Sequence, residues 1–245
     1  MDLFEKEFDN YLISYDGSVK EIRFKHSHSY KVEELMEQLA KKLKLSKEEI
    51  KVAKIIGLLH DIGRFEQIKQ YKKCNDVKSG VDHADESVIY LFDKGHIRDF
   101  IKEDKYDQII KNAIKNHNKY SIDKNISGKS LLFAKMIRDM DKVDIFRVLY
   151  EEFTYAYNKD EISEKVQESI DKQVCVDSHD IKNKTDAILS YCAFLYDINF
   201  KESFEILREN KNFEKFLTIL TAVPGSEEKL NELKQYYLKY IEDVK

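Results

Sequence analysis

Residues that favour tight turns are scarce in this sequence, which has seven glycines and a single proline among 245 residues. Folds built from many short strands need frequent turns, and glycine and proline supply much of the backbone geometry that turns require. Lysine, glutamate, isoleucine and leucine are abundant, in agreement with long helices. The sequence therefore predicts an all-α fold.

Apolar residues recur at helical spacing along the chain. The pattern predicts helices at about residues 3–15, 28–43, 83–93, 104–118, 129–157 and 160–172, with two or three more after residue 181. Ser46 and Glu49 form a capping box that opens one further helix, which carries His60. Gly63 stands where a helix-ending glycine is expected, and the polar residues 71–82 are predicted to form a loop.

The charge balance limits the class of partner. The chain has 42 basic and 46 acidic residues, a formal charge of −4, so no basic surplus indicates an extended nucleic-acid groove. A phosphorylated small molecule the size of a nucleotide remains a suitable partner, because a bound metal can supply local positive charge.

Several features favour a cytoplasmic protein. No apolar run approaches 18 residues, so no membrane span is expected, and the first residues lack the pattern of a signal peptide. Cys74, Cys175 and Cys192 are odd in number and show no C-x-x-C pairing, as is typical of single thiols in a reducing compartment.

Histidines and an aspartate fall on the apolar faces of several predicted helices. His28, His60 and His117 lie on such faces, Asp141 does the same, and His83 opens a helix. Each residue alone is explained as a hydrogen-bonded core residue or a cap. Together they indicate more, because a buried carboxylate without a partner is costly and imidazole with carboxylate suits Fe, Mn, Zn or Co.

The order His28, His60-Asp61, His83, His117, Asp141 resembles the HD phosphohydrolase superfamily. The motifs that carry the resemblance are HSYKV, LLHDIGRF, DHADES, IKNHN and RDMDKVD, over roughly residues 20–150. The resemblance implies a compact multi-helix HD-domain bundle. We expect this domain at residues 1–155 and a C-terminal helical extension at 156–245 that packs on the same bundle.

The resemblance also implies a metal site. Its minimal form holds one metal through four residues, here His28, His60, Asp61 and Asp141. His83 and His117 are similar to the extra pair in members that hold two metals, with Asp61 as the bridge. The alternative is a one-metal enzyme in which this pair contacts substrate or the ligands. One or two divalent ions are expected, Fe or Mn, with Zn, Co and Ni as the other candidates.

Such a site lowers the pKa of bound water and clamps a phosphoryl oxygen, so a metal-activated hydroxide can attack phosphorus. We expect Asp61 to orient that hydroxide, and Arg64 and Lys142 to meet the substrate phosphate. Asp144 is a candidate for orienting a ligand histidine, and Asp76 with Lys78 for reaching the pocket mouth. The alternative for Arg64 is a solvated residue just past a helix end, and for Lys142 and Asp144 it is a surface salt bridge.

Three functions fit these observations. The first is a metal-dependent phosphohydrolase that cleaves a phosphoester or phosphoanhydride bond, of a nucleotide in the favoured form. The second is a nucleotide-sensing module of HD type without turnover. The third is a helical interaction protein whose histidines only pack in the core. Metal content separates the third from the first two.

Overall fold

The computed structural model describes residues 2–72, 76–152, 160–220 and 227–242. Within these residues every regular element is a helix, which confirms the predicted all-α fold. The chain divides into two compact units, Met1–Asp141 and Lys142–Lys245, and each is described by itself. The boundary predicted between residues 155 and 156 lies outside the described residues.

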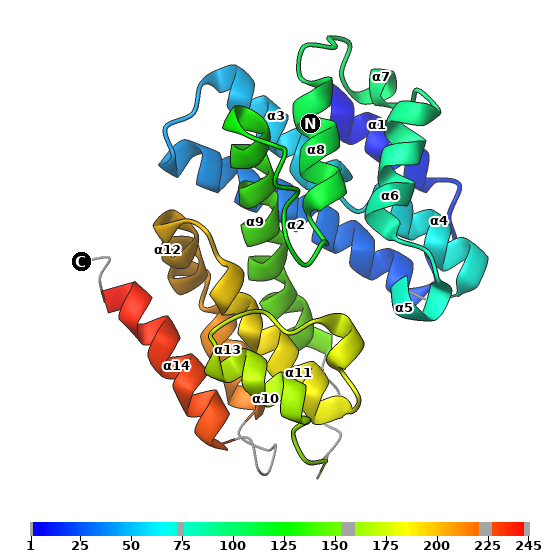
Figure 1. Cartoon of the computed structure of the whole chain (residues 1–245). Helices are drawn as coiled ribbons and strands as arrows, with labels where there is room; N and C mark the ends of the chain where they lie inside the picture. Colours follow the sequence, from blue (N-terminus) through cyan, green and yellow to red (C-terminus); the bar gives the residue numbers. More distant parts are fainter. Residues whose placement is uncertain (1, 73–75, 153–159, 221–226, 243–245) are drawn as a thin grey trace. The chain divides into compact units, whose positions relative to one another are not determined.

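The first unit is a bundle of helices of very different lengths (Figure 1). Its elements are α1 (Leu3–Leu12), α2 (Lys20–Lys42), α3 (Lys47–Leu59), α4 (Ile62–Tyr71), α5 (Asp76–Ser79), α6 (His83–Val88), a π-helical turn (Ile89–Asp93), α7 (Ile97–Phe100), α8 (Asp107–Asn116) and the first part of α9 (Gly128–Glu152).

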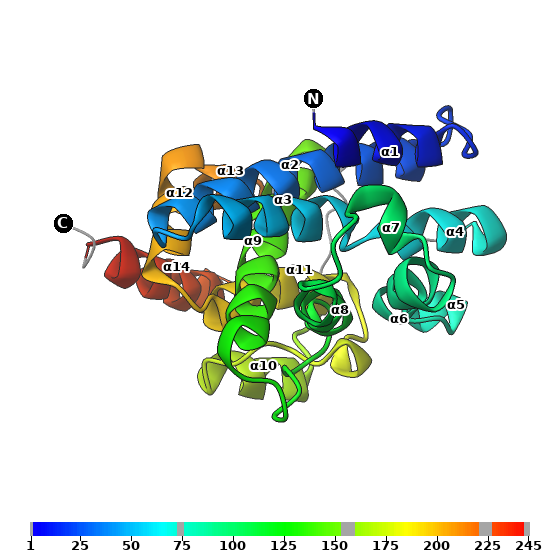
Figure 2. The same ribbon diagram turned by 90° about the horizontal axis from the view of Figure 1, so that it is seen from above.

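Helices α2 and α3 form a hairpin and lie side by side in both ribbon views (Figures 1 and 2). The predicted capping box opens α3: the Ser46 side chain accepts from the Glu49 backbone, and the Glu49 carboxylate accepts from the Ser46 backbone. A Cβ on Gly57 of α3 would lie 2.8 Å from the Glu33 Cα and 2.9 Å from the Val32 carbonyl oxygen. Glycine is therefore required at position 57 for the two backbones to approach so closely.

The helices differ from the predicted ones most clearly in four places. Helix α2 begins at Lys20 instead of residue 28, so His28 lies inside a helix. The helix predicted at 83–93 is α6 followed by the π-helical turn. The predicted loop 71–82 contains the short helix α5. Helix α4 was not predicted, because its first turn follows α3 after only two residues.

Aromatic rings join α1 to α4. Phe8 makes edge contacts with Phe65 of α4 and with Tyr30 of α2, at centroid distances of 5.9 and 5.8 Å. The Tyr11 hydroxyl donates to the Ile62 carbonyl oxygen at 3.0 Å, and burial raises the pKa of this hydroxyl. The start of α4 is therefore fixed from the side of α1.

A buried carboxyl group lies where α1, α2 and α3 meet. Glu33 of α2 is 4% exposed, and its Oε1 lies 3.3 Å from the ammonium of Lys54, which also pairs with Glu5 and Asp2 of the N-terminal segment. Burial raises the pKa of Glu33, the neighbouring Glu5 raises it further, and Lys54 lowers it, with a net value of about 7. Below about pH 7, the folded chain therefore favours the protonated form of Glu33.

Glu33→Gln is expected to flatten the pH dependence of stability. Because the folded state keeps a proton that the unfolded state releases from about pH 4.5 upward, the contribution of Glu33 is lost as pH rises toward 7. The loss amounts to roughly 1–3 kcal/mol. Urea unfolding at pH 5 and pH 7 should show this decrease in the wild type and in the control Glu34→Gln, whose side chain is 54% exposed. An equal decrease in Glu33→Gln would contradict the assignment.

The second unit is also helical. After the end of α9 it contains α10 (Glu164–Asp171), a 3-10 turn (Ser178–Asp180), α11 (Lys184–Cys192), a second 3-10 turn (Ala193–Asp197), α12 (Lys201–Asn210), α13 (Asn212–Leu220) and α14 (Glu227–Glu242). The prediction of two or three helices after residue 181 was wrong, since the described residues include four α-helices there. The break predicted at Pro224-Gly225 lies outside the described residues.

An aromatic cluster and a buried aspartate stabilise this unit. The Phe146 ring lies 5.0 Å from the ring of Phe213, which contacts Tyr237 at 4.7 Å. The fully buried Asp186 carboxylate accepts from the backbone and hydroxyl of Ser163 and from the Lys182 backbone. These hydrogen bonds join the start of α11 to the start of α10.

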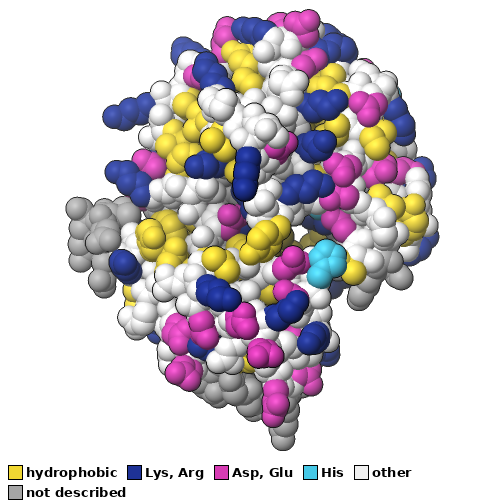
Figure 3. Space-filling view, viewed as in Figure 1, with side chains coloured by type: hydrophobic (Ala, Val, Ile, Leu, Met, Phe, Trp, Pro, Cys, Tyr) yellow, Lys and Arg dark blue, Asp and Glu magenta, His cyan; other side chains and the backbone are white. Residues whose placement is uncertain are grey.

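Charges of both signs are mixed on the surface. On the face in Figure 3, basic and acidic side chains are interspersed, as the near balance of the two types in the sequence suggests. None of the described helices combines the length and the apolar character needed to cross a membrane.

Candidate metal centre

His60 and Asp61 form a tight corner between two helices. Helix α3 ends at Leu59 and α4 begins at Ile62, so the pair occupies the whole connection. The buried Ser87 hydroxyl of α6 lies 3.0 Å from the His60 carbonyl oxygen, to which it donates, and 2.9 Å from the Gly63 N–H, from which it accepts. One side chain of α6 therefore satisfies backbone groups on both sides of the corner.

Gly63 does not end a helix, contrary to the prediction from sequence. It lies in the first turn of α4, where a Cβ would be 2.6 Å from the His83 carbonyl oxygen, 2.6 Å from the Ser87 nitrogen and 2.9 Å from the Glu86 Cβ. Glycine is thus needed here because α4 and α6 pack backbone against backbone.

The six predicted ligands come from five places in the first unit and converge. His28 lies on α2, His60 and Asp61 at the corner, His83 at the start of α6, His117 just after α8, and Asp141 on α9. Five of the side chains are buried, and the Asp141 side chain is 21% exposed.

Asp61 lies between two pairs of histidines. Its Oδ2 is 3.7 Å from His28 Nε2 and 3.5 Å from His60 Nε2. Its Oδ1 is 3.1 Å from His83 Nε2 and 3.5 Å from His117 Nε2. Each carboxylate oxygen thus faces a different pair of imidazoles.

Asp141 completes one half of this arrangement. Its Oδ1 lies 3.1 Å from His28 Nε2 and 3.7 Å from His60 Nε2. One half therefore contains two histidines and two carboxylates, and the other half contains two histidines and the shared Asp61.

Hydrogen bonds on the far side of the rings orient three of the histidines. His60 Nδ1 donates to the Gly57 carbonyl oxygen at 2.8 Å, and His117 Nδ1 donates to the Ile114 carbonyl oxygen at 2.7 Å. His83 Nδ1 donates to the Asp76 carboxylate at 2.6 Å. In a neutral imidazole the other nitrogen then carries a lone pair, so Nε2 is the ligand atom.

The cluster contains polar atoms that a cation would satisfy. His83 Nε2 and His117 Nε2 lie 2.9 Å apart, and two lone pairs at that distance repel unless a proton or a metal ion lies between them. His60 Nε2 and Asp61 Oδ1 are buried and make no hydrogen bond of good geometry with the described residues. This donor set of imidazole and carboxylate fits a divalent transition metal.

Comparison with known families agrees with this geometry. Residues 26–145 match the model of the HD domain family, and that range includes all six residues of the cluster. The chain carries an HD domain. HD domains belong to a superfamily of metal-dependent phosphohydrolases and bind divalent metals. No curated protein and no solved structure matches the chain.

Three groups of His and Asp donors in the described part of the chain are compact enough for an ion, with all donor atoms of a group within 4.8 Å. The groups are His28–His60–Asp141, His60–Asp61–His117 and Asp76–Asp82–His83. The first two consist entirely of predicted ligands. The third joins one predicted ligand to two carboxylates that already pair with Arg64 and Lys119.

The acidic residues of the HD domain's cluster are ionised. Burial alone would raise the pKa of Asp61, but the nearby Lys25 ammonium and the histidines outweigh it and hold the pKa well below its usual range. Burial would also raise the pKa of Asp141, but the neighbouring imidazoles of His28 and His60 outweigh it and hold the pKa well below its usual range. Burial lowers the pKa of His117 to about 4, so this imidazole is neutral at pH 7 and able to bind a metal.

Lys25 also lies at the site, and it was not predicted from the sequence. Its ammonium lies 2.5 Å from Asp61 Oδ2, and its side chain is only 16% exposed. Lys25 precedes His28 by three residues on α2, so the two side chains share a helix face. That spacing was the signal that could have identified it.

The predicted phosphate-binding residues have different partners. The Arg64 guanidinium lies beside the cluster, with its Nε 3.9 Å from Asp61 Oδ1 and its Nη1 2.6 Å from Asp76 Oδ1. Lys142 follows Asp141 on α9 and begins the second unit, where its ammonium pairs with Asp197 at 2.8 Å. Asp144 makes a two-pronged ion pair with Arg147.

Proposed function

We propose that this protein is a hydrolase that uses its HD domain to cleave a phosphoester or phosphoanhydride bond of a phosphorylated small molecule, a nucleotide in the favoured form. The observation that carries the proposal is the position of Asp61, whose two oxygens each face a separate pair of histidines. A carboxylate with that geometry is suited to bridge two metal ions.

The residues divide into two halves in this proposal. His28, His60 and Asp141 would hold one divalent ion, His83 and His117 the other, and Asp61 would bridge them. Such ions supply a water of lowered pKa that can attack phosphorus near neutral pH. Asp61 would also orient that water. Fe and Mn remain the favoured ions, with Zn, Co and Ni as the other candidates.

We assign two cations beside the cluster, both paired with carboxylates, to the phosphate group. Arg64 presents a planar guanidinium beside the half that contains His83, and guanidinium binds phosphate oxygens through paired hydrogen bonds. Lys25 contributes an ammonium on the side of Asp61 Oδ2. Lys142 stays a predicted phosphate ligand, and it would have to leave Asp197 to act as one.

A nucleotide is supported by an exposed aromatic ring that lies close to one ligand in the sequence. Tyr120 follows His117 by three residues, and 60% of its surface is exposed. An exposed tyrosine ring can stack on a base. The interspersed surface charges favour a small molecule over a nucleic-acid strand.

Metal removal should abolish activity. The protein is purified without chelator, its metal is measured by elemental analysis, and nucleotides and generic phosphoesters are screened with Mn²⁺ or Fe²⁺. Turnover is expected to be lost after dialysis against a chelator and restored by Mn²⁺. A protein that holds no transition metal and hydrolyses none of these compounds would refute the proposal. A nucleotide that raises the melting temperature but is recovered uncleaved would favour a sensing module instead.

A further inference from the structure

The short helix α5 is fixed to α4 by one buried amide. Gln67 of α4 is 2% exposed, and its Nε2 lies 2.9 Å from each of three acceptors, namely Asp76 Oδ1, Ser79 Oγ and the Val81 carbonyl oxygen. The two N–H groups of the amide are shared among these acceptors. Asp76, the first residue of α5, is therefore held in a defined place beside the metal centre.

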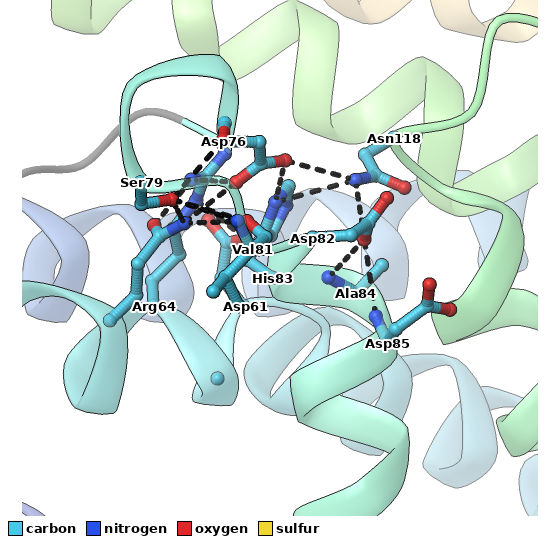
Figure 4. Close-up of polar contacts among 12 residues, drawn as sticks. Asp61, Arg64, Asp76, Ser79, Val81, Asp82, His83, Ala84, Asp85 and Asn118 are labelled. Carbon is cyan, nitrogen blue, oxygen red and sulfur yellow. Dashed lines mark hydrogen bonds and ion pairs between the residues drawn. The ribbon is translucent and has the colours of Figure 1, made fainter.

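The two oxygens of Asp76 serve two different functional residues. Oδ2 accepts from His83 Nδ1 at 2.6 Å, and from the Asn118 amide at 3.3 Å. Oδ1 accepts a hydrogen bond from Arg64 Nη1 at 2.6 Å. Figure 4 shows Asp76 among these three side chains, which come from α4, α6 and the segment after α8.

Each of these two contacts positions a group that the proposed hydrolysis uses. The bond to His83 Nδ1 orients the ring and leaves Nε2 as the ligand atom, and carboxylates that bind a metal-ligating histidine in this way strengthen metal binding. The bond to Arg64 holds a long, flexible cation beside the cluster, so less conformational freedom is lost when a phosphate binds.

We propose that Asp76 is a positioning residue that couples the second half of the metal centre to phosphate binding by Arg64. One carboxylate orients His83 and positions Arg64, so replacing it should lower metal affinity and phosphate affinity together. This inference rests on the proposed function, because it assumes that His83 binds a metal and Arg64 a phosphate.

Cobalt titration of Asp76→Asn tests the metal side. The amide keeps the size of the carboxylate but loses its charge and one of its two acceptor oxygens. The wild type is expected to take up two Co²⁺ ions, followed by visible absorption and elemental analysis. In Asp76→Asn the first ion should bind as before and the second about 10–100-fold more weakly. The control Asp85→Asn, on α6 but 50% exposed and paired only with Lys119 among the contacts described, should bind both ions like the wild type.

Inorganic phosphate tests the coupling to Arg64. Its affinity for the cobalt-loaded protein is measured by calorimetry in Asp76→Asn, in Arg64→Gln and in the double variant. If Asp76 acts through Arg64, both single variants bind phosphate more weakly and the double variant is no weaker than Arg64→Gln alone. Fully additive losses would mean that Asp76 does not aim Arg64 and would overturn the coupling.

Two further results overturn the inference. A wild-type affinity for the second ion in Asp76→Asn does so and leaves the proposed function untouched. A wild-type chain that takes up a single ion also does so, and it would rule out the two-ion form of the proposed function as well. If Asp76→Asn does not fold, Gln67→Met provides the second variant, since it removes the amide that holds Asp76 and should weaken the second ion in the same direction. Failure of the proposed function is seen separately, as a metal-loaded wild type that hydrolyses no phosphorylated compound.

Discussion

Asp61→Ala is expected to abolish turnover and to remove metal from both halves of the centre. Each oxygen of Asp61 faces one pair of histidines, so no other residue of the cluster can replace it in both halves. Loss of a group at the centre of the transition state lowers the rate by roughly 10³-fold or more. Elemental analysis and a phosphoester assay measure the two effects on the same preparation.

The matched control for Asp61→Ala is Asp99→Ala. Asp99 is 55% exposed and pairs with His96, a histidine outside the cluster. This variant should keep the metal and the activity of the wild type, and circular dichroism should show the same helix content in all three proteins. Retention of two ions by Asp61→Ala would disprove the bridging role, whatever its activity.

Gly63→Ala is expected to give the largest loss of stability among single-methyl changes in the first unit. The new Cβ would lie 2.6 Å from backbone atoms of His83 and Ser87, and neither can move without separating α4 from α6. Overpacking of this kind lowers the free energy of unfolding by about 1–3 kcal/mol, and by more where backbone must shift. Because the shift also displaces His83 from Asp61, weaker Co²⁺ binding should accompany the lower urea midpoint.

Gly17→Ala provides the comparison for that prediction. A Cβ on Gly17 meets no atom within 4 Å, so the same chemical change adds no clash there. Stability is expected to stay the same or rise by about 0.4–1 kcal/mol, since alanine restricts the unfolded chain. Equal effects of the two substitutions would show that α4 and α6 do not pack as closely as described.

The helical class and the inward position of His28, His117 and Asp141 could be predicted from sequence for a physical reason, whereas the full set of six ligands was implied by the family resemblance. Helical spacing decides which face a residue occupies, and residues with apolar neighbours at i±4 and i±7 must turn inward. His28, His117 and Asp141 satisfy this rule, and the structure places them in one cluster. That they bind metal stays a prediction.

The role of Gly63 could not be predicted, because a glycine near the end of an apolar run is as typical of a helix end as of close helix packing. Only the position of α6, twenty residues further along the chain, distinguishes the two. Helix α4 was missed for a related reason: its first turn is stabilised by Tyr11 and Ser87, which are distant in sequence. Long-range partners of this kind leave no periodic pattern.

The partners of Arg64 show the same limit in the site itself. The sequence placed a basic residue next to the His60-Asp61 pair and a polar loop before His83, but nothing local shows that Asp76 contacts both. That contact depends on the packing of Gln67 against α5. Spacing along the sequence can show which single residues face the site. Contacts between residues that are distant in sequence depend on how the helices pack.

The two carboxylates of the cluster determine how the site attracts an anion. Asp61 and Asp141 are ionised and contribute two negative charges, and His117 is neutral at pH 7. A single divalent ion cancels the charge of these two carboxylates, and a second adds two positive charges to those of Lys25 and Arg64 beside the cluster. The second ion would then strengthen the field that draws a phosphate inward. The association rate of an anionic substrate should therefore depend more steeply on salt in the doubly loaded protein than in the singly loaded one.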